Sequence, residues 1–320
     1  MISQKVTYHR GLNMSGAEFG HRLPGVEGTD YTWNDEASFR YFAEKGFDLY
    51  RIPFLWERIQ PELNRPFDEQ YLAGLKNSVA YSRKYGVNVV LDLHNYGRYY
   101  GEIIDVGTVT VDHIVDLWVR LSNEFKDEPA IYAYGIMNEP HDMQSANWKA
   151  ISQAVVTAIR NNGDNTLLAI PSDNWTGAHS WQINNPPWID DPADNIIYEA
   201  HQYFDHDHSG TYKKTYDEEL EIHPNLVEQG RLRVHGFAEW CRKYNVKGFL
   251  GEFGVPKDDP RWLEVMDAFL DELDTYGIDS AYWSAGIWWG DNTMAVQPYD
   301  NYTRPSEQEA VLRKHLPVTE

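Results

Sequence analysis

The segment Ala133-Tyr-Gly-Ile-Met-Asn-Glu-Pro140 has the pattern of a buried β-strand that ends in a carboxylate. Its apolar run has the length of a strand, and Pro140 stops that strand directly after Glu139. A second segment, Lys247-Gly-Phe-Leu-Gly-Glu-Phe-Gly254, repeats the pattern and carries Glu252. A carboxylate at the end of a parallel strand lies where a barrel enzyme holds its chemistry. Two such carboxylates, far apart in the sequence, indicate an acid/base or acid/nucleophile pair.

Strand and helix patterns alternate along the chain on both sides of these segments. Apolar residues at i, i+3, i+4 and i+7 predict helices between the strands, such as those over 114–125 and 148–158. A third helical stretch, 262–273, is followed by Gly277, which we predict as its C-cap. The eight predicted strands are residues 6–13, 48–53, 88–93, 131–137, 167–171, 195–200, 247–251 and 280–283.

The number and order of these elements predict the fold. Eight βα units in 320 residues favour a closed parallel barrel over an open, doubly wound sheet. No Gly-x-Gly-x-x-Gly fingerprint or Walker loop opens a helix, which disfavours a nucleotide-binding fold. No linker or repeat divides the chain, so we predict an α/β protein with one (β/α)8 TIM-barrel domain over residues 1–320. The longest connections, 172–194 and 202–227, should overhang the face that carries the chemistry.

Composition excludes several classes of partner. The net charge of −21 would repel the phosphates of a nucleic acid. No apolar run has the length of a membrane span, and we expect no membrane association. The single cysteine, Cys241, lies in a helical pattern and is expected to be a packed residue, and we expect the protein to be a monomer. The N-terminal residues lack the apolar core of a signal peptide, so either the protein is cytoplasmic or a leader has been removed.

The ends of the predicted strands bring a ring of polar and aromatic residues to one face. The ring consists of Arg51, His94, Asn95, Asn138, Glu139, His201, Tyr203, Glu252 and Trp283. Polar groups inside a barrel are costly to bury unless they are hydrogen-bonded. Their concentration at one end of the strands, around two glutamates, therefore indicates a site.

Seven motifs in this order resemble those of glycoside hydrolase family 5, the large cellulase family of retaining β-glycosidases. They are Gly11-Leu-Asn-Met-Ser-Gly-Ala-Glu-Phe-Gly20, Arg51-Ile-Pro-Phe-Leu-Trp-Glu-Arg58, Leu91-Asp-Leu-His-Asn-Tyr-Gly97, Met137-Asn-Glu-Pro140, His201-Gln-Tyr203, Gly251-Glu-Phe-Gly254 and Tyr282-Trp-Ser-Ala-Gly286. Residues 17–20, 56–58 and 288–291 look closest to the endo-β-1,4-glucanase branch of that family. Residues 205–210 read Asp-His-Asp-His-Ser-Gly here, and these extra histidines leave the fine substrate specificity open.

The resemblance implies a role for each glutamate. Glu139 would be the general acid/base and Glu252 the nucleophile, and retention needs the two carboxyl groups about 5–5.5 Å apart. Glu139 would have to be protonated for the first step and act as a base toward water in the second. The implied substrate is a β-1,4-glucan or a short β-gluco-oligosaccharide, and neither a cofactor nor a metal is expected.

The resemblance also implies supporting residues. Arg51 would hydrogen-bond Glu252 and keep it ionised, Tyr203 would orient Glu252, and His201 would lie near Glu139. Asn138 would donate to the 2-hydroxyl of the sugar, and His94 would face the sugar at subsite −1. Further candidates for contact with the substrate are Trp283 as the floor of that subsite, and Asn95, Trp33, Trp175 and Trp289.

Three other interpretations remain open from the residues. Residues 205–208 could each bind a divalent ion, but adjacent residues rarely converge on one ion, which disfavours a metal site. A non-catalytic glycan-binding barrel would fit a chain that had lost one glutamate, and both are present. Within the enzyme class, the substrate could be mixed-linkage glucan, mannan or xyloglucan, or the action could be exo on short oligosaccharides.

Overall fold

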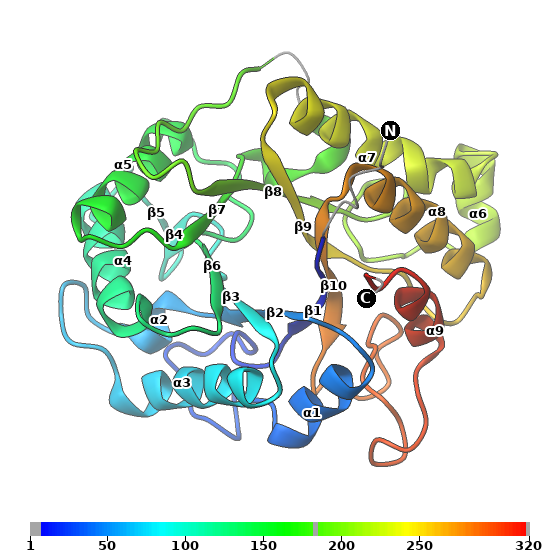
Figure 1. The fold of residues 1–320 in the computed structure, drawn as a ribbon, viewed down its shortest axis with the longest axis horizontal. Coiled ribbons are helices and arrows are strands. Elements are labelled where there is room, and N and C mark those ends of the chain that lie inside the picture. The colour runs from blue at the N-terminus through cyan, green and yellow to red at the C-terminus, as the bar shows by residue number, and fades with distance from the viewer. Residues whose placement is uncertain (1–7, 182–184, 318–320) are drawn as a thin grey trace, which may run out of the picture.

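The computed structural model describes residues 8–181 and 185–317, in which eight parallel strands close into a barrel surrounded by helices (Figure 1). Each strand pairs with its neighbour in the chain, and the last pairs with the first. The barrel strands are β1 (Arg10–Met14), β2 (Leu49–Phe54), β3 (Asn88–Leu93), β6 (Ile131–Gly135), β7 (Leu167–Pro171), β8 (Ile196–Gln202), β9 (Lys247–Phe253) and β10 (Asp279–Ala285). The predicted (β/α)8 TIM barrel is confirmed.

Helices follow most of the strands and cover the outside of the barrel (Figure 1). They are α1 (Glu36–Glu44), α2 (Trp56–Ile59), α3 (Glu69–Lys84), α4 (Val111–Phe125), α5 (Trp148–Asn161), α6 (Tyr216–Ile222), α7 (Leu226–Tyr244), α8 (Arg261–Tyr276) and α9 (Glu307–Lys314). Gly277 ends α8 in the left-handed conformation with φ 62°, which confirms the predicted C-cap. Cys241 is buried in α7, as expected.

The strand boundaries agree closely with the prediction, and the main differences lie at the ends of the chain and in one hairpin. β3 and β7 have the predicted bounds, whereas β1 begins at Arg10, and residues 6 and 7 of the predicted strand lie outside the described residues. A two-stranded hairpin, β4 (Arg98–Tyr99) and β5 (Glu102–Ile103), was not predicted. Strands of two residues carry too little periodicity to be recognised in a sequence.

The inward-facing positions of the strands change from apolar to charged along the barrel. A small interior cluster fills the lower part and consists of Leu49, Val90, Ala133, Leu167, Ala169, Ile197, Phe249 and Ala281. Two residues further along, on the same faces of β2, β3 and β8, come Arg51, Asp92 and Glu199, all fully buried. Because side chains two apart in a strand point the same way, the charged residues form a layer above the apolar one. This layer lies beneath the ends of the strands.

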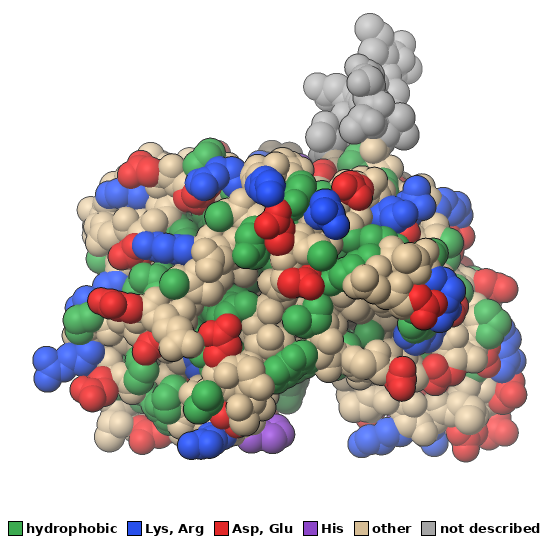
Figure 2. All heavy atoms as spheres, turned by 90° about the horizontal axis from the view of Figure 1, so that it is seen from below, with side chains coloured by type: hydrophobic (Ala, Val, Ile, Leu, Met, Phe, Trp, Pro, Cys, Tyr) green, Lys and Arg blue, Asp and Glu red, His purple; other side chains and the backbone are tan. Residues whose placement is uncertain are grey.

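On the face that Figure 2 shows, acidic and basic side chains are intermixed. Figure 2 shows Lys, Arg, Asp and Glu side chains spread over one face without a large gathered patch of either sign, and a hollow in its lower edge. Within residues 8–181 and 185–317, no helix combines the length and the apolar character needed to cross a bilayer.

Candidate active site

A cavity of about 980 Å³ opens where the barrel strands end. Seven residues of the predicted site line it, namely His94, Glu139, Trp175, His201, Tyr203, Glu252 and Trp283. The long connections after β7 and β8 contribute further lining residues, including Asn174, His179, Asp207 and His208. The expectation that these connections overhang the site is confirmed.

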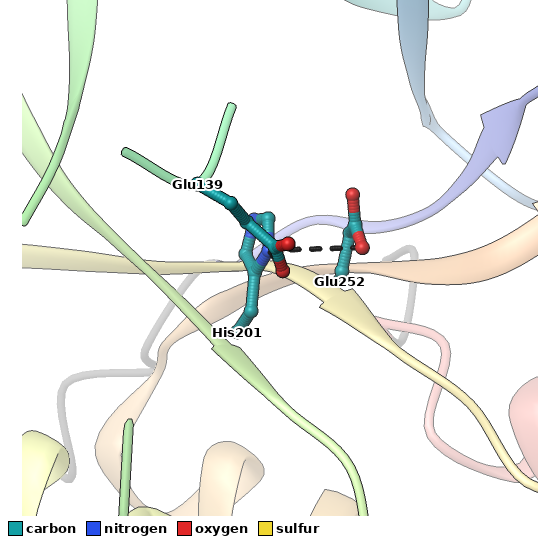
Figure 3. Close-up of side chains that lie close together, drawn as sticks. All are labelled: Glu139, His201 and Glu252. Carbon is teal, nitrogen blue, oxygen red and sulfur yellow. Dashed lines mark hydrogen bonds and ion pairs between the residues drawn. The ribbon is translucent and has the colours of Figure 1, made fainter. Parts of the chain in front are cut away.

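The two glutamates face one another, and His201 lies beside Glu139 with one ring nitrogen near both carboxyl groups (Figure 3). His201 Nδ1 lies 2.7 Å from Glu139 Oε1 and 3.7 Å from Glu252 Oε2. An oxygen of each carboxyl group lies within 4.8 Å of the other. Glu139 follows β6 with a left-handed φ of 41°, a conformation that costs energy in a residue with a side chain and is common at functional sites. The fold thus brings together two carboxyl groups that are 113 positions apart in the sequence.

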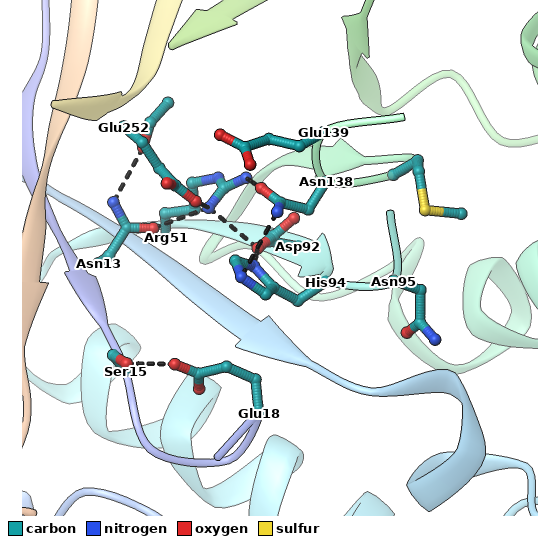
Figure 4. Close-up of polar contacts among 12 residues, drawn as sticks. Asn13, Ser15, Glu18, Arg51, Asp92, His94, Asn95, Asn138, Glu139 and Glu252 are labelled. Carbon is teal, nitrogen blue, oxygen red and sulfur yellow. Dashed lines mark hydrogen bonds and ion pairs between the residues drawn. The ribbon is translucent and has the colours of Figure 1, made fainter. Parts of the chain in front are cut away.

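Arg51 lies beneath this pair and connects several strands (Figure 4). Its guanidinium group is fully buried and lies 3.2 Å from Glu252 Oε1, as predicted. It also contacts Asp92 at 2.9 Å and Glu199 at 3.0 Å. Two amide oxygens accept hydrogen bonds from it, those of Asn13 at 2.9 Å and Asn138 at 2.8 Å. A planar group with five donors suits this many acceptors better than a lysine would.

Tyr203 holds the second oxygen of Glu252. Its hydroxyl donates to Glu252 Oε2 at 3.1 Å, while Arg51 donates to Oε1. Both oxygens of the carboxyl group are therefore fixed in direction, which agrees with the predicted contacts of Arg51 and Tyr203. Burial raises the pKa of the Tyr203 hydroxyl, and the charge of the neighbouring Glu252 raises it further.

Burial and neighbouring charges act in opposite directions on the ionisable groups of the site. Burial raises the pKa of Glu252, and Glu139 adds to this, while the charges of His201 and Arg51 oppose it. Burial alone would lower the pKa of His201, but the surrounding carboxylates of Glu252, Glu139 and Glu199 raise it to about 10. These carboxylates favour the protonated ring, in which Nδ1 donates a hydrogen bond to Glu139.

His94 and Trp283 form a second part of the lining. Their rings are stacked, with centroids 5.3 Å apart and planes at 14°. Asp92 holds His94 Nδ1 at 2.7 Å, which leaves Nε2 toward Tyr96 and the amide nitrogen of Asn138. Because the oxygen of Asn138 accepts from Arg51, the orientation of its amide is set. The predicted contact of that amide with the sugar stays a prediction.

Trp175 also lines the cavity and is about half exposed, at 49%. Its indole stacks on His141 with centroids 3.4 Å apart and planes at 8°. Three consecutive residues, Asn174 to Thr176, have left-handed φ values of 54°, 60° and 49°. This strained turn presents Trp175 to the cavity, and no glycine in the sequence signals it.

Three of the predicted substrate contacts, Asn95, Trp33 and Trp289, are not among the residues that line the cavity, and their contact with the substrate stays a prediction. Asn95 turns away from the cavity, accepts from the N–H of Trp56 and donates to Glu57 (Figure 4). Trp33 packs on Tyr71 with ring centroids 4.9 Å apart. The ring of Trp289 meets that of Trp283 edge-on, with ring centroids 6.2 Å apart.

The histidine-rich loop after β8 contributes to the wall of the cavity. His208 stacks on His179 with centroids 3.6 Å apart and planes at 7°. Burial lowers the pKa of His208 to about 4 and also lowers that of His179, so both rings are neutral near pH 7. The side chains of Asp205 and His206 have separate partners, since Asp205 accepts from the N–H groups of residues 210 and 212 and His206 contacts Glu219. The four residues 205–208 therefore do not converge on one point.

The site has no obvious place for a resident cation among the described residues. Glu139, His201 and Glu252 offer ligand-type atoms close together, but the surrounding carboxylates favour a protonated His201 ring, and Arg51 supplies a further positive charge. This arrangement favours proton sharing over metal binding. Two carboxyl groups, one imidazolium and one guanidinium can instead donate, accept and stabilise charge on a bound substrate.

The prediction missed Asp92 and Glu199, both fully buried and both essential to the geometry described above. Each precedes a histidine of the site by two residues in a strand, Asp92 before His94 and Glu199 before His201. Residues two apart share a face of the strand, so a carboxylate–x–histidine pattern near a strand end is a signal that could have found them.

Replacing Arg51 by Met should destabilise the protein in a pH-dependent way. It leaves buried carboxylates without a counter-ion, which commonly costs about 3–5 kcal/mol at neutral pH. Without Arg51 the pKa of Glu252 would rise further above its value in the unfolded chain. A raised carboxyl pKa costs more stability as the pH increases, so the loss at pH 7 should exceed that at pH 5. Urea unfolding at both pH values measures this, and equal losses would contradict it.

Comparison with known proteins places this geometry in a family context. Residues 12–288 match the model of the family described as cellulase (glycosyl hydrolase family 5). An endo-beta-1,4-glucanase B of Emericella nidulans is 34% identical over 297 residues, covering 91% of this chain and 86% of that protein.

Solved structures are similar over nearly the whole chain. Pseudomonas stutzeri endoglucanase Cel5A in complex with cellobiose has a TM-score of 0.88 at 38% identity, covering 96% of this chain and 91% of that one. XacCel5A in complex with cellopentaose has a TM-score of 0.88 at 36% identity, covering 97% of this chain and 99% of that one.

Proposed function

The chain belongs to glycosyl hydrolase family 5, the cellulase family, and is a glycosidase, and from this premise we propose that it cleaves β-1,4-glucan internally with retention of configuration. In this proposal Glu139 is the general acid/base and Glu252 is the nucleophile. The observation that carries it is the pair of carboxyl groups that face one another in the cavity, with His201 Nδ1 near both.

The separation of the pair supports the retaining reaction. A retaining enzyme needs its carboxyl groups about 5–5.5 Å apart, whereas an inverting one leaves about 6.5–9.5 Å for a water molecule. Here oxygens of the two groups lie within 4.8 Å of one another. This spacing is close to the separation of a retaining pair and shorter than that of an inverting pair.

The reaction then has two steps. Glu252 attacks the anomeric carbon while Glu139 gives its proton to the leaving glycosidic oxygen, and a covalent glycosyl-enzyme forms. Glu139 next takes a proton from water, the water oxygen attacks the same carbon, and the bond to Glu252 breaks. Two inversions give a β product from a β substrate. His201 donates a hydrogen bond to Glu139 and stabilises its carboxylate after the first step, until Glu139 takes a proton from water in the second.

The proposed substrate rests on the shape and lining of the cavity and on the relatives. Trp283 is partly exposed and offers a flat ring in the cavity that holds the catalytic pair, and the half-exposed Trp175 offers another in the same cavity. The structural relatives carry cellobiose and cellopentaose in their complexes. Flat rings spaced along a cavity are suited to successive glucosyl units of a β-1,4-linked chain.

Replacing Trp283 by Ala should reduce kcat/KM for cellotetraose by about 10- to 100-fold. The estimate corresponds to the loss of one large apolar contact with the sugar, worth about 1.5–3 kcal/mol. Trp283→Phe, which retains a smaller ring, should lose less. Steady-state kinetics of both variants measure the effect, and equal kcat/KM in Trp283→Ala and the unaltered enzyme would refute the platform role.

The choice of glycan is tested by measuring products and their chain lengths from carboxymethylcellulose, mixed-linkage glucan, mannan, xylan and cello-oligosaccharides. Mid-chain cleavage of carboxymethylcellulose is expected. Activity confined to a non-cellulosic glycan or to short oligomers would overturn the substrate but keep the two-glutamate mechanism. Absence of activity on all five would favour the non-catalytic, glycan-binding alternative.

A further inference from the structure

Glu199 lies beneath the catalytic pair and contacts neither of its carboxyl groups in the interactions described above. It is fully buried in β8, and one of its oxygens, Oε1, lies between two cations. His201 Nε2 is 3.1 Å from this oxygen, and Arg51 Nε is 3.0 Å from it. His201 in turn reaches Glu139, and Arg51 reaches Glu252. Glu199 therefore connects the two positive groups that serve the two catalytic carboxyl groups.

The backbone leaves a space in which Glu199 can make this contact. Gly251, the residue before Glu252, faces the junction of Glu199 and His201. A β-carbon at position 251 would lie 1.9 Å from Glu199 Oε1 and 2.9 Å from His201 Nε2. Any side chain at position 251 would separate the two groups, so the contact depends on glycine there. The close approach is a specific feature of this part of β9.

We propose that Glu199 is a positioning residue for the reaction, one that orients the ring of His201 and keeps it doubly protonated, so that an N–H always faces Glu139. This inference rests on the proposed roles of Glu139 and Glu252 and adds a residue to them. The role needs the negative charge of Glu199 as well as its shape.

The chemistry of the first step explains why such a residue is useful. When Glu139 gives its proton to the leaving oxygen, it becomes a carboxylate in a partly buried place beside Glu252. An imidazolium stabilises that charge, whereas a neutral ring whose Nδ1 lone pair faced Glu139 would repel it. Glu199 bonds to Nε2 on the far side of the ring and so favours the protonated form that has N–H on both sides.

The groups that face His201 come from three elements. Glu139 lies in the connection after β6, Glu199 on β8 itself and Glu252 on β9, with Arg51 of β2 behind Glu199. Glu139 and Glu252 change their charge during the reaction, because one gives up a proton and the other forms a bond to the sugar. Glu199 takes no part in either change, and its carboxylate is a constant partner for His201.

Glu199→Gln tests the proposal because it keeps the shape and removes the charge. The titration of the His201 Cε1–H signal, identified by its absence in His201→Asn, should move down by about 1–3 pH units, the usual effect of losing an adjacent charge. The basic limb of kcat/KM should move in the same direction, so activity falls more at pH 9 than at pH 6. Glu199→Asp retains the charge and should recover most of the shift.

Glu272→Gln is the matched control, since Glu272 contacts His235 at 2.6 Å on the outer helices, away from the cavity. It should leave the His201 titration and the pH profile unchanged. An unchanged His201 titration in folded Glu199→Gln would overturn the proposal, as would an equal drop in Glu199→Asp. If Glu199→Gln does not fold, the ¹⁵N chemical shifts of the His201 ring in the unaltered protein at pH 8 show how many of its two nitrogens are protonated. Two protonated nitrogens are expected, and one would overturn the proposal.

These measurements separate the two proposals. The titration of His201 is read without substrate, so it can fail while Glu139 and Glu252 keep their roles. Conversely, the predicted shift in the His201 titration can be observed even if variants of Glu139 and Glu252 contradict the proposed function.

Discussion

Glu252→Gln should lower kcat on cello-oligosaccharides by about 10⁴- to 10⁶-fold, the size of loss found when an enzyme is deprived of its covalent nucleophile. The amide has nearly the same shape as the carboxylate but cannot form the glycosyl bond. Binding of cellobiose should remain measurable by calorimetry, because the rings that line the cavity are unchanged. A variant with the original kcat would show that Glu252 is not the nucleophile.

The same variant should be at least as stable as the original protein at pH 7. Burial raises the pKa of Glu252, so its ionised form is disfavoured in the folded state. A carboxyl group with a raised pKa reduces stability once the pH exceeds its unfolded value, and the neutral amide removes that cost. Thermal unfolding of both proteins measures this. A rise in Tm together with lost turnover separates a catalytic defect from a folding defect.

The raised pKa of Glu252 also predicts the acid limb of the activity profile. The nucleophile must be ionised, so kcat/KM should fall as the pH drops through a value above the usual pKa of glutamate. Arg51, His201 and His94 oppose the rise and limit how far it goes. A limb at or below the usual value would contradict the effect of burial.

Glu139→Ala should lower kcat/KM on cello-oligosaccharides by about 10²- to 10⁴-fold, the typical contribution of a general acid. The loss should be much smaller with dinitrophenyl cellobioside, because that leaving group departs without a proton. Azide should then accelerate turnover, since it enters the space of the missing carboxyl group and attacks the glycosyl-enzyme without needing a base. The bond to Glu252 breaks, and the expected product is β-cellobiosyl azide.

The stereochemistry of the azide product distinguishes the two glutamates. In Glu252→Ala, azide would replace the nucleophile itself and attack the substrate directly, which gives α-cellobiosyl azide. NMR of the products identifies each anomer. An α product from Glu139→Ala, or no response to azide with full activity on cello-oligosaccharides, would contradict the acid/base role.

The strands could be predicted because their apolar runs are bounded by Gly, Pro and helical patterns. The barrel followed from their number and order, and the site followed because functional residues gather at strand ends. Arg51, His201, Tyr203 and Glu252 were identified in this way. The contacts that the family resemblance implied, those of Arg51 and Tyr203 with Glu252 and of His201 with Glu139, are present. These residues are held by the regular geometry of parallel strands, which a sequence pattern encodes.

The remaining features depend on turns and on contacts between distant segments. Asn95 follows His94 at a strand end, yet Tyr96 and Gly97 have left-handed φ values of 53° and 75° and the chain turns away there. Trp175 owes its place to a left-handed turn without glycine. Trp33 fits against Gly74 and Tyr71 of α3, a packing contact that no local pattern specifies.

The buried charges were missed for a different reason. Asp92 and Glu199 lie within apolar strands, where a single charged residue does not alter the strand pattern. Their partners come from other strands, and only the closed barrel brings Arg51 between them. A carboxylate two residues before a histidine is visible in the sequence. Recognising it as part of the site requires knowing which face of the strand points inward.

The most direct test of the two-glutamate mechanism is the anomeric configuration of the first product. Hydrolysis of cellotetraose or cellopentaose can be followed by ¹H NMR from the first minutes, before mutarotation mixes the anomers. We predict that the new reducing end appears first as the β anomer and that the α anomer grows later. Initial appearance of the α anomer would mean a single inversion, and Glu252 could then not form a covalent intermediate.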